Sequence, residues 1–208
     1  MIFVIEKNTN EEIKMADNKI FEIMQSFQWA QSVIYQGNRV FIYFDLEASK
    51  ADKKREYFEE IEKTQNFDLL SLLSQPTNDI EIEPFIRIME EHFFVIALGK
   101  SIDYFKKFNE YDKIIHEIDN LFSLKKIADL RNMREHDDEY VSGAGHAQSR
   151  FNFNNVSKNY TGDMTATYCT PSEYYLGNVE IRGIVNYYTN KLANIHNIYK
   201  CVFDSLVK

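Results

Sequence analysis

The groups best suited to chemistry are concentrated in one short stretch, Arg131-Asn132-Met133-Arg134-Glu135-His136. An imidazole has an unperturbed pKa of about 6.5, so His136 could take or give a proton at neutral pH. The guanidinium of Arg131 stays charged and presents a planar fork of donors, which suits an anionic group. Asn132 could orient either neighbour. The candidate catalytic residues are therefore Arg131, Asn132 and His136.

An amphipathic helix over residues 124–140 is expected to position these groups. Its apolar residues recur at three- and seven-residue steps, which is typical of a helix with one buried face: Ile127, Leu130, Met133 and Tyr140. Five residues at about 100° each put Arg131 and His136 about 140° apart around the helix. Asn132 lies four residues before His136 and shares its face. Ser123 is the predicted N-cap.

A charged, solvated helix face is one alternative interpretation of the same stretch. Arg131 with Glu135, and Arg134 with Asp138, are opposite charges four residues apart. Such pairs stabilise an exposed helix by a few tenths of a kcal/mol.

A metal-dependent phosphohydrolase is a second alternative. His136-Asp137 would be its histidine–aspartate pair, with His116 and Asp163 as further ligands. The residues before that pair should be mostly apolar to bury the metal, but they are Arg134 and Glu135. The prediction is therefore of no metal and no cofactor.

The composition favours one helical domain over residues 1–208. The chain has 16 Phe, 13 Tyr and 1 Trp, but only seven Gly and three Pro, too few for a β-rich fold with many turns. The net charge of −8 argues against non-specific nucleic-acid binding, so any such contact must rest on a local site. The two cysteines, the short apolar start and the absence of a long apolar run predict a cytoplasmic protein without a membrane span.

The apolar periodicity predicts a bundle of helices. They are expected at residues 11–36 (ended by Gly37), 49–65, 84–98, 102–122 (after a junction at Gly99 and Ser101), 124–140 and 178–206. Residues 39–44 are expected to form a short strand or a buried connector. Within a loop and hairpin insertion at 142–176, strands 151–156 and 164–170 are expected to pair across the turn KNYTGD.

The last helix carries a heptad seam, of the kind that packs inside a bundle or between two chains. The seam consists of Ile181, Val185, Tyr188, Leu192, Ile195, Tyr199, Val202 and Leu206.

The spacing Arg131-x4-His136, with the polar Asn132 directly after the arginine, resembles the signature of the HEPN family (higher eukaryotes and prokaryotes nucleotide-binding). These are small helical-bundle proteins, many of which are metal-independent ribonucleases. The family motif is Arg, four to six residues, then His, often with Asn, Asp or His after the Arg. The match covers the motif helix in detail, and the helical pattern is compatible over most of the chain. The resemblance implies a mainly α, HEPN-like bundle, here with a small β-hairpin inserted before the last helix.

The resemblance also implies a function. This would be a metal-independent endoribonuclease of the toxin or phage-defence type, a homodimer with a composite site, with RNA as substrate and an antitoxin as partner. His136 would deprotonate the 2′-hydroxyl, and Arg131 would hold the phosphorane charge. The nearby residues predicted to bind substrate are Arg134, Tyr140, His146 and Arg150. The alternative is a non-catalytic HEPN-like module that binds nucleotides or proteins.

Overall fold

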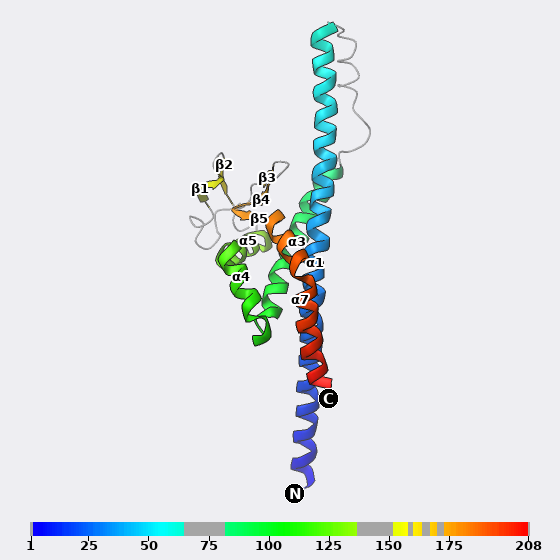
Figure 1. Ribbon diagram of the computed structural model, residues 1–208, viewed down its shortest axis with the longest axis vertical. Coiled ribbons are helices and arrows are strands. Elements are labelled where there is room, and N and C mark those ends of the chain that lie inside the picture. Colours follow the sequence, from blue (N-terminus) through cyan, green and yellow to red (C-terminus); the bar gives the residue numbers. More distant parts are fainter. Residues whose placement is uncertain are drawn as a thin grey trace.

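The computed structural model describes residues 2–64, 82–136, 152–157, 160–163, 167–169 and 173–207. These residues are mainly helical, with two small antiparallel sheets before the last helix, as Figure 1 shows. In chain order the elements are α1 (Ile2–Thr64), α3 (Ile82–Phe105), the 3-10 turn η1 (Asn109–Tyr111), α4 (Asp112–Phe122), α5 (Leu124–Glu135), β1 (Asn152–Ser157), β2 (Tyr160–Asp163), β3 (Thr167–Cys169), β4 (Tyr174–Leu176), β5 (Val179–Glu180) and α7 (Ile181–Val207).

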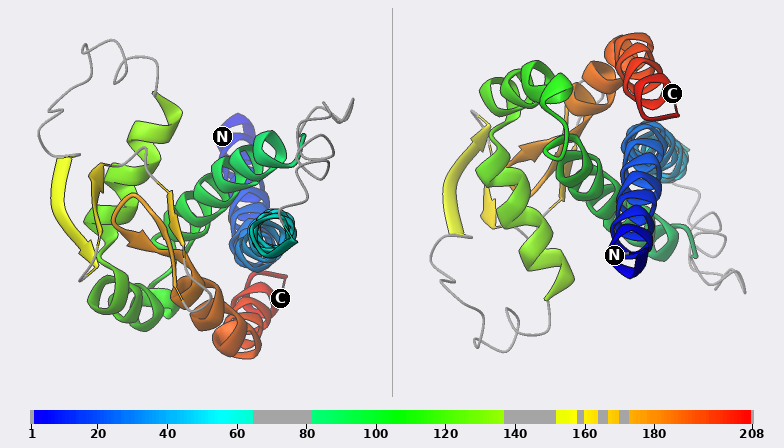
Figure 2. Two further views of the ribbon diagram at one scale, coloured as in Figure 1. Left: turned by 90° about the horizontal axis from the view of Figure 1, so that it is seen from above. Right: turned by 90° about the horizontal axis from the view of Figure 1, so that it is seen from below.

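Helix α1 is the long helix on which α3 and α7 pack, along its middle. Its fully buried residues step by three and four along one face: Ile23, Ser26, Ala30, Val33, Gly37 and Val40. Both ends of α1 extend beyond α3 and α7 (Figure 1). Seen along its axis in Figure 2, α1 lies at the edge of the molecule, away from β1 and β2.

The prediction that a helix ends at Gly37 is wrong, because α1 continues to Thr64. A Cβ added to Gly37 would lie 2.2 Å from Val185 Cγ2 and 3.3 Å from Phe94 Cε2. The glycine thus lets α3 and α7 approach the middle of α1, and it does not end a helix. Residues 39–44, expected as a strand or connector, belong to the same helix, as does most of the predicted helix 49–65.

The predicted junction at Gly99 and Ser101 is also wrong. Helix α3 runs through both to Phe105, and Ser101 is fully buried, where its Oγ accepts a hydrogen bond from the Tyr188 hydroxyl at 3.1 Å. The chain breaks instead within the predicted helix 102–122, where η1 precedes α4. The rings of Phe105 and Tyr111 stack there at 4.4 Å, so aromatic packing accounts for the turn.

The predicted N-cap at Ser123 is confirmed. Its Oγ accepts a hydrogen bond from the Lys126 backbone N–H at 3.4 Å, and the Asp119 carboxylate accepts one from the Leu124 N–H at 2.9 Å. Helix α5 buries its predicted apolar residues Ile127, Leu130 and Met133, then ends at Glu135 with His136 as its C-cap. The predicted helix end at residue 140 is therefore too late, and residues 137–140 lie outside the described part.

The strand pairing differs from the predicted hairpin. Strand β1 pairs with β2, which lies inside the segment predicted as a turn, while β3 pairs with β4 and β4 with β5. Gly177, at φ 57°, makes the left-handed turn between β4 and β5. The Glu180 carboxylate then accepts hydrogen bonds from the backbone N–H groups of Arg182 (2.9 Å) and Gly183. This cap starts α7 at Ile181 rather than at residue 178.

The heptad seam of α7 is used inside the chain. Its members Ile181, Val185, Tyr188, Ile195 and Val202 are buried in the common core. On the same helix, Tyr199 stacks on Phe27 of α1 with ring centroids 5.3 Å apart. Among the described residues, no helix combines the length and the apolar character that a membrane crossing requires.

Candidate functional site

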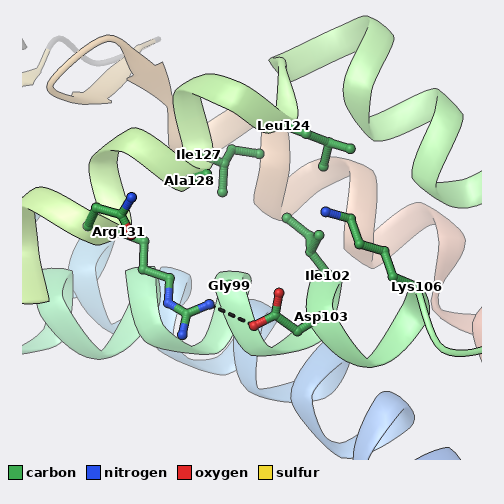
Figure 3. A pocket seen from close by; sticks show the side chains of 9 residues that line it. Gly99, Ile102, Asp103, Lys106, Leu124, Ile127, Ala128 and Arg131 are labelled. Carbon is green, nitrogen blue, oxygen red and sulfur yellow. Dashed lines mark hydrogen bonds and ion pairs between the residues drawn. The ribbon is translucent and has the colours of Figure 1, made fainter. Parts of the chain in front are cut away.

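The candidate site lies in a small cleft between α3 and α5, with a volume of about 80 Å³ (Figure 3). Its lining residues are Gly99, Ile102, Asp103 and Lys106 from α3 and Leu124, Ile127, Ala128, Arg131 and Asn132 from α5. Aliphatic side chains line one part of the cleft, and charged or amide groups line the rest. Two of the three candidate catalytic residues, Arg131 and Asn132, therefore border one cleft.

The Arg131 side chain is held in a fixed direction. It lies across Gly99, where an added Cβ would come within 2.6 Å of Arg131 Cδ. Its Nη1 donates to Asp103 Oδ2 at 2.7 Å, and its Nε donates to Glu135 Oε1 at 3.0 Å. Burial alone would lower the pKa of Arg131, but the hydrogen bonds to Glu135 and Asp103 raise it. The guanidinium is thus charged and preorganised.

Asn132 and His136 are exposed on α5, four residues apart, as the helical spacing predicts. The His136 backbone N–H donates to the Met133 carbonyl at 3.3 Å and so closes the last turn. Arg131, by contrast, reaches toward α3.

Arg134 points toward the interior rather than the cleft. Only 13% of its side chain is exposed, and its Nη2 lies 3.5 Å from Oε2 of Glu91, whose side chain is 1% exposed. The Nε and Nη2 atoms of Arg134 are buried, and neither has a hydrogen-bond partner among the residues that the structure describes. This position suits charge compensation in the core more than contact with a large substrate.

Glu91 is the centre of a buried polar cluster that the sequence did not reveal. Its carboxylate accepts hydrogen bonds from Arg87, from the Tyr174 hydroxyl at 2.8 Å and from the Thr167 hydroxyl at 3.2 Å. Burial and then the charge of Glu91 raise the pKa of Tyr174. The cluster joins α3 and α5 to the three-stranded sheet.

Arg87 connects this cluster to helix α1. Its Nε donates to Glu47 on α1 at 2.9 Å while its Nη1 binds Glu91. The spacing of Arg87 and Glu91, four residues apart on a helix, was the only sequence signal for the cluster. The two long-range partners, Glu47 and Tyr174, have no such local signature.

A second, larger cleft of about 340 Å³ lies between the α4–α5 turn and the β4–β5 hairpin. It is mainly polar, and Lys126, Tyr175, Asn178 and Glu180 are among its lining residues. The Asn178 Oδ1 atom is buried and has no hydrogen-bond partner within the described part of the chain. Of the predicted site residues that the structure describes, none lines this cleft.

Three of the predicted substrate-binding residues, Tyr140, His146 and Arg150, lie outside the described residues. So does Asp137 of the alternative metal pair. Over the part of the chain that the structure describes, no three His, Cys, Asp or Glu side chains gather into a group that could hold a metal ion.

Comparison with known proteins adds no relative. No protein-family model matches the chain, and neither a curated protein nor a solved structure matches it.

Proposed function

We propose that the chain is a HEPN-like, metal-independent endoribonuclease whose catalytic residues are Arg131, Asn132 and His136. The observation that carries the proposal is the fixed guanidinium of Arg131 at a cleft that also contains Asn132 and Lys106. A preorganised cation is what charge stabilisation of a phosphorane requires. It also supplies the local site that an acidic chain needs in order to bind RNA.

The proposed cleavage reaction follows from the side chains of His136 and Arg131. The His136 imidazole takes the proton of the RNA 2′-hydroxyl, and the 2′-oxygen attacks the adjacent phosphorus. Nη1 and Nε of Arg131 bind Asp103 and Glu135, so Nη2 is the nitrogen assigned to the phosphate oxygens. The P–O5′ bond breaks, the 5′-oxygen takes a proton from water, and the His136 imidazolium returns its proton to solvent. The products are a 2′,3′-cyclic phosphate and a 5′-hydroxyl.

A second copy of the chain completes this site. The helical spacing puts Arg131 and His136 about 140° apart around the helix, so one copy is not expected to direct both groups toward a single phosphate. The exposed ridge of α5 consists of Lys125, Ala128, Asn132 and His136. Ala128, small and central, allows two such ridges to approach about a two-fold axis. The histidine of one copy then lies near the arginine of the other.

The test is RNA cleavage in the presence of EDTA. Wild type is expected to cleave and leave the cyclic phosphate, and His136→Ala is expected to abolish cleavage. His116→Ala is the matched control, because His116 is an exposed histidine on α4 away from the cleft. Arg131→Lys is expected to impair cleavage strongly, because an ammonium lacks the planar fork.

Two results would contradict the proposal. Cleavage that persists in His136→Ala would remove the proton acceptor from the mechanism. Cleavage by wild type that stops with EDTA would favour the metal interpretation around His136-Asp137.

A non-catalytic nucleotide-binding module is the second candidate. It is favoured by the two ion pairs of Arg131, which neutralise much of its charge before any ligand binds. Under this alternative, a nucleoside phosphate binds wild type but binds Arg131→Ala more weakly, and RNA stays intact.

A further inference from the structure

The outer face of α1 carries a long row of exposed side chains, here called the outer stripe. Its eleven positions are Asp17, Phe21, Met24, Gln28, Gln31, Tyr35, Arg39, Ile42, Leu46, Ser49 and Lys53. All of these except Arg39 are exposed, and five are large apolar or aromatic residues. Phe21, Tyr35 and Ile42 are 56%, 59% and 57% exposed, respectively. The stripe is therefore a continuous surface that α3 and α7 leave uncovered.

The spacing of the outer stripe follows a straight helix. The ten steps from position 17 to position 53 span 36 residues. The mean step is therefore 3.6 residues, which is one α-helical turn. The stripe therefore stays on one side of α1 for about 54 Å. The five large apolar or aromatic members lie between Phe21 and Leu46. Exposed apolar patches on globular proteins often mark interaction sites.

The stripe is complementary to itself when it is read in the opposite direction. Tyr35 is its centre, and steps of four, three, four, three and four residues lead outward on both sides. Antiparallel pairing about Tyr35 puts Met24 opposite Leu46 and Gln28 opposite Ile42. At the two ends it puts the negative Asp17 opposite the positive Lys53. We propose that α1 pairs in this antiparallel register with α1 of a second copy of this chain, about a two-fold axis at Tyr35.

Charge complementarity favours this arrangement over a parallel pair and over antiparallel registers shifted by two turns. A parallel pair would put Asp17 against Asp17 and Lys53 against Lys53, which is repulsive. Shifting the antiparallel register by two turns in one direction puts Asp17 against Glu60, again with like charges. Shifting it in the other direction puts Asp17 against the apolar Leu46. The register centred on Tyr35 gives opposite charges at both ends and puts the apolar Met24 and Leu46 opposite each other.

This interface is distinct from the proposed catalytic ridge. Helix α5 packs on α3 and α4, whereas the outer stripe lies on the face of α1 that α3 and α7 leave open (Figure 2). The pairing of α1 therefore does not rest on the ribonuclease proposal. A chain that uses both two-fold contacts assembles beyond a dimer.

Disulfide trapping tests the register directly. Helices that pack 8–10 Å apart bring residues on a two-fold axis to Cα separations of about 4–6 Å, within disulfide range. In a full-length background with Cys169→Ser and Cys201→Ser, Tyr35→Cys is expected to form a covalent dimer under mild oxidation. Gln28→Cys is the matched control, because its two copies would lie about 21 Å apart along the axis.

Charge exchange at the stripe ends tests the pairing by a second route. Asp17→Lys and Lys53→Asp each replace two attractive contacts by repulsion, and each is expected to weaken self-association about tenfold. The double variant restores opposite charges and is expected to regain wild-type association. Circular dichroism confirms that these exposed substitutions leave the helices intact.

Three outcomes would overturn the proposal. Tyr35→Cys could fail to form a dimer, Gln28→Cys could cross-link as readily, or the double charge exchange could fail to restore association. If the outer stripe instead pairs with a different protein or lies on a lipid surface, Tyr35→Cys fails to form a dimer. Ribonuclease activity that persists in Asp17→Lys separates this interface from the catalytic one.

Discussion

The side chain of Arg131 lies across the backbone of Gly99, so closely that a Cβ on the glycine would come within 2.6 Å of Arg131 Cδ. Asp103, one turn further along α3, accepts a hydrogen bond from Arg131 Nη1 at 2.7 Å. Helix α3 therefore sets the direction of the guanidinium that α5 carries. A glycine within a helix costs about 1 kcal/mol relative to alanine, and here it leaves space for this side chain.

Gly99→Ala is expected to displace Arg131 while changing stability little. The arginine side chain is flexible and can move, and the alanine gains helix propensity. RNA cleavage should fall about tenfold as the guanidinium leaves its position. Gly37→Ala is the contrasting variant, because its Cβ would meet Val185 in the core and destabilise the chain by about 1–3 kcal/mol. Urea unfolding of both variants measures the difference, and equal unfolding free energies would contradict this account.

Asp103→Ala and Glu135→Ala are each expected to reduce RNA cleavage only slightly. Either variant leaves Arg131 with one carboxylate partner. The double variant releases the Arg131 side chain. Its loss of RNA cleavage rate should exceed the product of the losses in the two single variants. Single-turnover cleavage rates for the four proteins measure this coupling. Strictly independent effects would show that the two carboxylates do not share the task of holding Arg131.

Glu91→Ala is expected to destabilise the fold by about 3–5 kcal/mol, because it removes the carboxylate that pairs with Arg134 and one of the two that pair with Arg87. The matched control is Glu22→Ala, which breaks a more exposed pair with Lys107 and should cost at most about 1 kcal/mol. The free energy of unfolding in urea distinguishes the two. A similar small loss in both variants would show that the buried cluster contributes little.

Stability is expected to decline above pH 10. Burial raises the pKa of Tyr111 to about 12, although its hydrogen bond with Ser26 acts in the opposite direction. Because the folded pKa exceeds the ordinary value of about 10, this contribution is complete below pH 10 and is lost as the pH rises toward 12. The loss amounts to about 2–3 kcal/mol. Burial also raises the pKa values of Tyr187 and Tyr188, which adds to the decline.

Urea midpoints between pH 8 and pH 11.5 measure this decline. Tyr111→Phe should lower stability at pH 8 through its lost hydrogen bond, but should then lose less between pH 10 and pH 11.5. An unchanged alkaline slope in the variant would rule out Tyr111 as a source of the effect.

Local patterns in the sequence were enough to predict the mainly helical fold, the buried faces of α5 and α7, and one cap. The periodic residues Ile127, Leu130 and Met133 are buried as expected, and Ser123 caps α5. The seam of α7 also faces the core. These features depend on neighbours within one or two helical turns, so the sequence alone determines them. The same local geometry predicts that Asn132 and His136 share one face of the helix and that Arg131 lies on another.

Contacts between residues far apart in the sequence decided the roles that local patterns did not predict. Gly37 and Gly99 have the residue type of helix ends, yet both lie inside long helices, because Val185 and Arg131 occupy the space where their side chains would be. Arg134 looked like a surface residue until the buried Glu91 was placed beside it. A glycine can end a helix or admit a neighbour, and an arginine can face solvent or a buried carboxylate. Only the packing of segments far apart in the chain selects between these roles.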